Sequence, residues 1–226
     1  RQSRKQVRML LAQKNSFQRH AEYYTERMGL RVLPCKGKIP ITPHGCKDAS
    51  ADPAQIASWW GNGQNHNIGI ATGNGIVVLD VDVDHERGKY GDETLAGLER
   101  QYGKLPDTWT CLSGGGGVHY YFACNDPALT VAAGFAPGLD YRGAGGYVIA
   151  PPSIHPDTGR AYEWEASSTP TNTALAPLPD WLHNLMLQGK TKQAKGKETT
   201  GEVTEGQRND ELFRLAASLR AKGLTV

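Results

Sequence analysis

The 226-residue sequence lacks any apolar stretch near the ~20 residues of a membrane-spanning helix, and residues 1–15 lack the apolar core of a secretion signal. Its 4 cysteines form no C-x-x-C pair, so neither a zinc ribbon nor a disulfide framework is indicated. The net charge of +2 is too small to indicate nucleic-acid binding by itself. We therefore expect a cytoplasmic globular protein with no membrane partner, in which any site for a polyanion is local.

Carboxylates interrupt the aliphatic run from Ile76 to Asp84 at every second position after Leu79. This alternation predicts a strand on which Asp80, Asp82 and Asp84 share one face, because successive side chains point to opposite faces. A row of like charges is unfavourable unless a cation lies among them, and carboxylate oxygens suit Mg²⁺ or Mn²⁺. The pattern therefore predicts a metal site, and a solvated acidic face is the alternative.

Four consecutive glycines separate two predicted strands, residues 108–113 and 118–124, which we expect to pair as a hairpin. The alternation in the second strand places His119 away from its apolar face. Bare glycine backbone such as Gly115 and Gly116 can approach a ligand closely, and its N–H groups can bind phosphate. A sharp turn would also explain the glycines.

Two more glycine-rich connections predict hairpins. Residues 73–75 would join a strand at 67–72 to the acidic strand, and residues 143–146 would join strands at 138–142 and 147–150.

Asp140 and Arg142 share one face of the predicted strand at 138–142. If that face meets Asp80 and Asp82, the site gains a third carboxylate and a cation that can bind an anionic group. An ordinary ion pair on a strand face is the alternative. Lys38 lies in a predicted turn at residues 36–40, which would expose its ammonium group.

Helix signals recur along the chain, with N-cap residues at Ser16, Asp52 and Asp92. Residues 1–11 have the pattern of a basic amphipathic helix. The composition becomes polar and basic after Gly189, which predicts a linker, and leucines recur at helical spacing near the end of the sequence.

Three motifs carry a resemblance to a known family: Val-Leu-Asp-Val-Asp at 78–82, Ser-Gly-Gly-Gly-Gly-Val-His at 113–119, and Gly-Leu-Asp-Tyr-Arg at 138–142 leading to Ala-Pro-Pro-Ser at 150–153. Together and in this order, they resemble the bifunctional primase-polymerase family of the archaeo-eukaryotic primase superfamily, over about residues 23–181. The resemblance implies an α+β fold, with an RRM-like mixed or antiparallel sheet and helices, a small N-terminal α/β module and a C-terminal helical segment. It divides the chain into a catalytic domain (1–189), a flexible basic linker (190–204) and the start of a helical primase C-terminal module (205–226).

By this resemblance the chain makes primers on single-stranded DNA and extends them with NTPs or dNTPs. The implied catalytic residues and ligands of Mg²⁺ or Mn²⁺ are Asp80, Asp82 and Asp140. The implied nucleotide ligand is His119, and the expected triphosphate contacts are Ser113, Gly115, Gly116, Arg142 and Lys38.

The sequence departs from the family in two respects. It shows no zinc-binding Cys/His insertion, and it lacks the helicase domain that is often fused to such primases. A replicative helicase is an expected partner. Two other functions remain open from the residues alone. A metal-dependent glycosyltransferase also uses D-x-D to hold a nucleotide-sugar, and an inactive single-stranded-DNA-binding module would need only the basic and aromatic residues.

Overall fold

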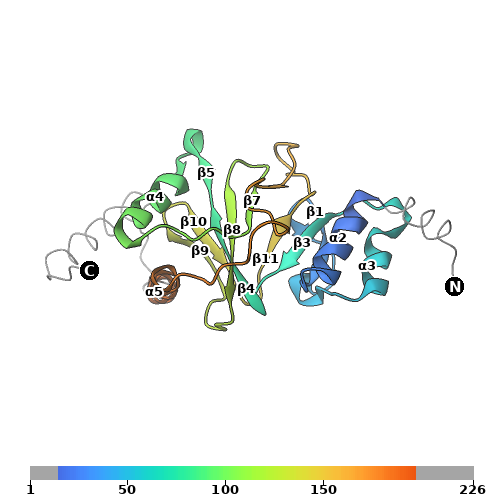
Figure 1. Cartoon of the computed structure of the whole chain (residues 1–226), viewed down its shortest axis with the longest axis horizontal. Coiled ribbons are helices and arrows are strands. Elements are labelled where there is room, and N and C mark those ends of the chain that lie inside the picture. The colour runs from blue at the N-terminus through green and yellow to red at the C-terminus, as the bar shows by residue number, and fades with distance from the viewer. Residues whose placement is uncertain (1–14, 197–226) are drawn as a thin grey trace, which may run out of the picture. The chain divides into compact units, whose positions relative to one another are not determined.

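The computed structural model describes residues 15–196, except for the side chains of Asn62 and of residues 190–196. The basic helix expected at 1–11 and the helical segment expected at 205–226 lie outside the described residues. The described chain has an α+β fold built on two antiparallel sheets, as predicted (Figure 1).

One sheet has four strands in the order β11-β3-β1-β2. Its strands are β1 (Val32–Lys36), β2 (Ile39–Pro40), β3 (Asn67–Ala71) and β11 (Tyr147–Ala150). Two helices, α2 (Ser16–Glu26) and α3 (Pro53–Trp60), bury Tyr24, Ile56 and Trp60 in the core that includes this sheet. Asp52 caps α3 as predicted, whereas Asn15 caps α2 in place of Ser16. The expected N-terminal α/β module is thus present, but its sheet is completed by β11 from much later in the chain.

The second sheet has six strands in the order β12-β7-β8-β4-β10-β9. In that order its strands are β12 (Glu163–Trp164), β7 (Thr110–Leu112), β8 (Val118–Cys124), β4 (Gly75–Val81), β10 (Leu139–Arg142) and β9 (Val131–Ala136). The helices α4 (Gly91–Tyr102) and α5 (Asp180–Gly196) follow in the chain. A two-stranded hairpin is formed by β5 (Val83–Asp84) and β6 (Lys89–Tyr90), and the short 3₁₀ helices are η1 (Gly45–Asp48), η2 (Gly61–Gly63) and η3 (His85–Arg87).

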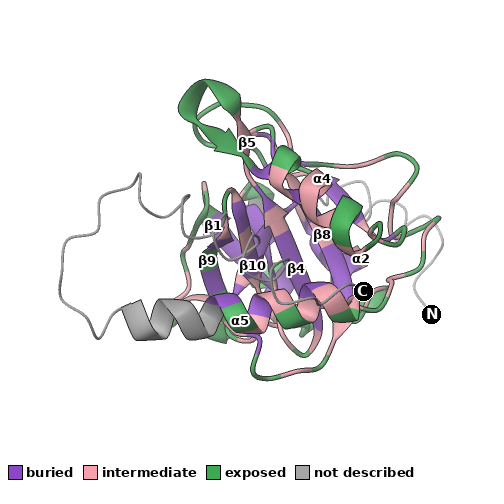
Figure 2. Ribbon diagram, turned by 90° about the vertical axis from the view of Figure 1, so that its left-hand side faces the viewer, coloured by how far each residue is buried: buried purple, intermediate pink, exposed green. Residues whose placement is uncertain are grey.

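The central strand β4 alternates as the sequence predicts. Val77, Leu79 and Val81 pack with Leu95 of α4 and Met186 of α5 in one core. Figure 2 shows these helices beside a largely buried sheet. The opposite face therefore carries the acidic positions.

That opposite face of β4 is apolar at one end and polar at the other. Ile76 and Val78 belong to the core shared with the four-stranded sheet, together with Tyr121 of β8. Asp80 follows on the same face, just past this packed region. The acidic site thus begins where the contact between the two sheets ends.

The hairpin predicted across residues 73–75 is wrong. β3 and β4 belong to different sheets, and only an isolated bridge links Gly73 to Ile76 across the turn. Gly73, Asn74 and Gly75 all have positive φ, so the chain turns tightly and passes from one sheet to the other.

The hairpin predicted across residues 143–146 is wrong in the same way, because β10 pairs with β4 and β9, whereas β11 pairs with β3. The two crossings pack against each other. The Thr72 hydroxyl donates to the Gly143 carbonyl at 2.7 Å, and the Thr72 N–H donates to the Gly146 carbonyl at 2.9 Å. A Cβ on Gly73 would lie 2.7 Å from the Cα of Ala144. This packing places β10 beside β4 and β11 beside β3.

The helix α5 runs to Gly196, so residues 190–196 are helical where the sequence predicted a linker. The remainder of the predicted linker, 197–204, lies outside the described residues.

Candidate active site

A cavity of about 960 Å³ opens on the polar end of the six-stranded sheet. It is bounded by β4, β8 and β10, by the β5–β6 hairpin, by β11 and by the segment from His155 to Tyr162. All the site residues predicted from the sequence line it: Lys38, Asp80, Asp82, Ser113, Gly115, Gly116, His119, Asp140 and Arg142. The fold thus brings together residues that are far apart in the sequence.

The centre of the site is a row across three neighbouring strands. Asp80 on β4 lies directly opposite His119 on β8 and directly opposite Asp140 on β10. Directly opposite residues in antiparallel strands have Cβ atoms about 4.5–5.5 Å apart. The register therefore fixes the spacing of His119, Asp80 and Asp140 through backbone hydrogen bonds of the sheet.

His119 and Asp80 form a buried ion pair, with 3.4 Å between Nε2 and Oδ1 and side chains that are 8% and 21% exposed. Burial alone would lower the pKa of His119, but the facing Asp80 carboxylate overrides this effect and raises that pKa to about 10. For Asp80, burial opposes ionisation, yet His119, Arg142 and Lys38 together hold its pKa below the usual value. The imidazolium and the carboxylate are thus both charged at neutral pH.

Arg142 lies between the two opposed carboxylates. Its Nη2 is 3.0 Å from Asp140 Oδ2 and 3.7 Å from Asp80 Oδ2. The Gly134 N–H donates to the other oxygen of Asp140 at 2.6 Å, at an irregularity in the pairing of β9 with β10. Burial raises the pKa of Asp140, and the Asp80 and Asp82 charges add to that rise. Asp140 is therefore the carboxylate whose pKa shows the repulsion between the negative charges of the site.

Asp82 and Asp84 differ in what they contact. Asp82 lies just beyond β4 and pairs with Lys89 at 3.2 Å, a contact in which both side chains are about half exposed. Asp84 caps η3 by accepting from the Arg87 N–H at 3.2 Å, and its carboxylate is 3.6 Å from the Arg87 guanidinium. Both carboxylates line the cavity, and Asp84 differs from Asp82 in that two contacts with Arg87 hold it.

A divalent cation fits the chemistry of this donor set. Among residues 15–196 no group of three or more metal-ligating side chains is already arranged around one point. Each of the three carboxylates instead pairs with a cationic side chain of the protein. Yet Asp80, Asp82 and Asp140 offer only oxygen donors, and their mutual repulsion is relieved by positive charge. Their present partners Arg142 and Lys89 supply the charge that Mg²⁺ or Mn²⁺ would replace.

The glycines of the loop at residues 114–117 allow close packing against neighbouring segments of the protein. A Cβ on Gly114 would collide with the Arg160 carbonyl and lie 2.6 Å from the Cβ of His155, and a Cβ on Gly115 would lie 2.9 Å from His155 Nε2. A Cβ on Gly117 would collide with the Val81 carbonyl. The bare backbone therefore admits neighbouring protein segments first. Its use in phosphate binding stays a prediction.

The sequence reasoning missed several residues that line the cavity: Lys89, His155, Asp157, Thr158, Arg160 and Tyr162. A weak signal was available, since most of them lie in one short polar loop between predicted strands, and loops often carry functional residues. Lys89 lies on the exposed β5–β6 hairpin, which the aliphatic pattern of the preceding strand did not reveal.

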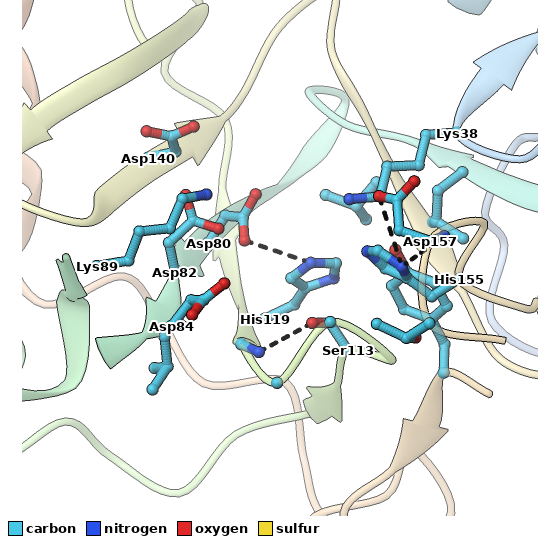
Figure 3. A pocket seen from close by; sticks show the side chains of 18 of the residues that line it. Lys38, Asp80, Asp82, Asp84, Lys89, Ser113, His119, Asp140, His155 and Asp157 are labelled. Atoms are coloured by element: carbon cyan, nitrogen blue, oxygen red, sulfur yellow. Dashed lines mark hydrogen bonds and ion pairs between the residues drawn. The ribbon is translucent and has the colours of Figure 1, made fainter. Parts of the chain in front are cut away.

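Most carboxylates of the cavity lie on one side. Figure 3 shows Asp80, Asp82, Asp84 and Asp140 there together with Lys89, whereas Lys38, His155 and Asp157 lie on the other side, with His119 between. The carboxylate side favours metal ions, and the side with Lys38 and Arg160 favours anions.

Comparison with protein families agrees with this arrangement. The family described as bifunctional DNA primase/polymerase, N-terminal, matches residues 21–181. The chain belongs to the bifunctional DNA primase/polymerase (Prim-Pol) family. The match covers both sheets and every predicted site residue, and at the level of the family it assigns nucleotidyl transfer of the primase-polymerase type. No curated protein sequence matches the chain. No helix among the described residues is long and apolar enough to cross a membrane.

Proposed function

We propose that this Prim-Pol domain is a DNA-dependent primase-polymerase, which makes primers de novo on single-stranded DNA and extends them by metal-dependent nucleotidyl transfer. The observation that carries the proposal is the row of His119, Asp80 and Asp140, fixed by strand register at the wall of one cavity. At about 960 Å³ the cavity lies at the upper end of the range of about 300–1,000 Å³ for small-molecule sites, which suits a nucleotide beside a primer end.

The acidic side of the cavity is the proposed reaction centre. Asp80, Asp82 and Asp140 would hold Mg²⁺ or Mn²⁺, and two such ions would supply activation of the primer 3′-hydroxyl and charge stabilisation at the leaving pyrophosphate. The chain places these carboxylates on adjoining strands or directly beyond one, so their positions do not depend on a mobile loop.

The nucleotide would lie between the two sides. His119 lies in the cavity wall with its orientation fixed by Asp80, and its positive charge would attract the triphosphate. Ser113, Gly115 and Gly116 line the same wall, and Lys38 and Arg142 add positive charge. The primer 3′-oxygen then bonds to the α-phosphorus, pyrophosphate leaves with the electrons of the broken P–O bond, and the hydroxyl proton passes to water.

The proposed partners are a single-stranded DNA template, the primer, NTPs or dNTPs, and a replicative helicase. Positive charge at Lys38, Arg142 and Arg160 gives the cavity local attraction for polyanions despite the small net charge.

A primer-extension assay with matched variants tests this function. Asp80→Asn and Asp140→Asn should each lower extension by at least about 10³-fold, because each removes a proposed metal ligand. Asp84→Asn is the control, since Asp84 lies on the same face but is held by Arg87. We expect it to retain most of the activity.

Two outcomes would contradict the proposal. If the wild-type chain binds single-stranded DNA but incorporates no nucleotide with Mg²⁺ or Mn²⁺, it is a binding module. If nucleotide-sugars support transfer and templated nucleotides do not, the D-x-D motif serves a glycosyltransferase.

A further inference from the structure

His155 is a buried polar residue of the cavity to which the proposed reaction gives no role. Its side chain is 8% exposed, and its Nδ1 accepts a hydrogen bond from the Asp157 N–H at 3.3 Å. A ring nitrogen that accepts carries no proton, so the proton of the neutral imidazole is on Nε2. Nε2 lies beside the glycine loop, 2.9 Å from the position of a Cβ on Gly115, and has no hydrogen-bond partner among residues 15–196.

The surroundings of His155 fix its ring and keep it neutral. Tyr162 stacks on the imidazole, with ring centroids 6.0 Å apart and an interplanar angle of 27°. Burial lowers the pKa of His155, and the positive charges of Lys38 and Arg160 lower it further. The nearest carboxylate, Asp157, lies on the Nδ1 side at 4.0 Å and is mostly exposed. Nε2 is therefore a fixed neutral donor.

Arg160 and the glycine loop add donors around the same point. Arg160 uses its Nε to donate to the Gly114 carbonyl at 2.9 Å, and Thr158 donates to the same oxygen at 2.7 Å. The terminal nitrogens of Arg160 remain as donors for a ligand, and Nη2 lies 3.8 Å from a Cβ placed on Gly116. The N–H groups of Gly114 and Gly115 have no acceptor within the described part of the chain.

Apart from the mostly exposed Asp157 carboxylate on the Nδ1 side, this group consists of donors and positive charge. Such a set favours the oxygens of a phosphate over a nucleobase, which needs both donors and acceptors. Figure 3 shows His155 on the side of the cavity away from Asp82 and Asp140. The cavity therefore has room for a nucleotide whose α-phosphorus lies at the carboxylates and whose distal phosphates extend to His155.

We propose that His155, with Arg160, binds the β- and γ-phosphates of a nucleoside 5′-triphosphate through its Nε2–H. The inference rests on the proposed function and adds to it what this end of the cavity recognises. That property is the number of phosphates, and not the base or the sugar. A monophosphate at the reaction centre would not reach His155.

Two variants of His155 separate the hydrogen bond from the packing. His155→Phe keeps a planar ring on Tyr162 and removes the donor, whereas His155→Gln keeps a side-chain N–H donor. The measurement is the dissociation constant of ATP, dATP, AMP and dAMP for the full chain with Mg²⁺, alongside thermal unfolding. His155→Phe should weaken triphosphate binding by about tenfold or more and leave monophosphate binding unchanged, since hydrogen bonds to charged groups have this magnitude. His155→Gln should recover most of the affinity.

Arg160→Gln provides a second variant if His155→Phe does not fold, because the Arg160 side chain is exposed. It should also reduce triphosphate affinity, more at low salt than at high salt. Retention of the wild-type ratio of triphosphate to monophosphate affinity in His155→Phe or in Arg160→Gln would overturn the inference. An equal loss of affinity for triphosphate and monophosphate leaves this ratio unchanged and is therefore the same result. Failure of the wild type to extend primers would instead overturn the proposed function.

Discussion

Variants of the two aspartates of the D-x-D motif should differ in thermal stability, although both aspartates are proposed metal ligands. Asp80 is buried against the His119 imidazolium, whereas the contact of Asp82 with Lys89 is about half exposed. Replacement by Asn keeps the size of each side chain and removes its charge. Asp80→Asn leaves His119 buried without a counter-charge, and Asp82→Asn leaves Lys89 in solvent. The first change should therefore destabilise the metal-free protein and the second should not.

The magnitudes follow from burial. A hydrogen bond to a charged group contributes about 1.5–3 kcal/mol, and relief of repulsion with Asp140 returns part of this, so Asp80→Asn should cost about 1–2 kcal/mol. An exposed ion pair contributes about 0–1 kcal/mol, which the same relief offsets for Asp82→Asn. For a domain of this size 1 kcal/mol shifts the melting temperature by about 2–4 °C, so we expect a fall of about 2–8 °C for Asp80→Asn and about 2 °C or less for Asp82→Asn.

Thermal unfolding in a chelating buffer, followed by circular dichroism, measures both changes. The account requires that Asp80→Asn unfolds at a clearly lower temperature than Asp82→Asn. An equal fall in both variants, or a rise for Asp80→Asn, would refute the buried ion pair as the structural contact of His119. Mg²⁺ or Mn²⁺ should stabilise the wild type more than either variant, because ligand binding to the folded state adds stability.

Three further changes test other parts of the structure. His119→Ala should weaken NTP or dNTP binding by about tenfold or more, and an unchanged affinity in a nucleotide titration would rule out this role. Gly114→Ala should lower the melting temperature because its Cβ would collide with the Arg160 carbonyl. Gly97→Ala in α4 should leave the temperature unchanged or raise it, because its Cβ would meet only Arg100 Nη2 at 3.8 Å, an ordinary contact distance. Similar effects of both variants would contradict the packing of the glycine loop. Removal of residues 197–226 should preserve primer extension and reduce de novo primer synthesis, since the protein must hold two free nucleotides on a bare template to initiate. Equal initiation by the truncated chain would place the whole initiation site within the first domain.

The sequence predicted individual strands better than their partners. The alternation around Asp80 correctly assigned the two faces of β4, because strand period and burial are local properties. The turns at 73–75 and 143–146 look like hairpin connections, but a glycine turn permits both a hairpin and a passage to another sheet. Packing of Thr72 against Gly143 decides between them, and that contact is not visible from either segment alone.

For the site, too, the sequence predicted local properties better than the pairing of strands. Its members were found from residue type and order, and all of them line one cavity. The row of His119, Asp80 and Asp140 depends on strand register, which sequence spacing does not determine. β9 was missed because Val131–Ala136 has a weak strand pattern with Gly134 inside it, yet the Gly134 N–H holds Asp140. His155 was not predicted because it is recognised as a site residue only by its burial in the cavity wall. Its loop has no periodic pattern from which burial could be predicted.

Template-directed synthesis is the most direct test of the central claim. The wild-type chain and Asp80→Asn would be incubated with Mg²⁺ or Mn²⁺, a single-stranded DNA of defined sequence and either labelled NTPs or labelled dNTPs, without primer. We expect products complementary to the template with the wild type and at least about 10³-fold less product with Asp80→Asn. Products that ignore the template, or equal synthesis by both proteins, would contradict a primase-polymerase centred on Asp80.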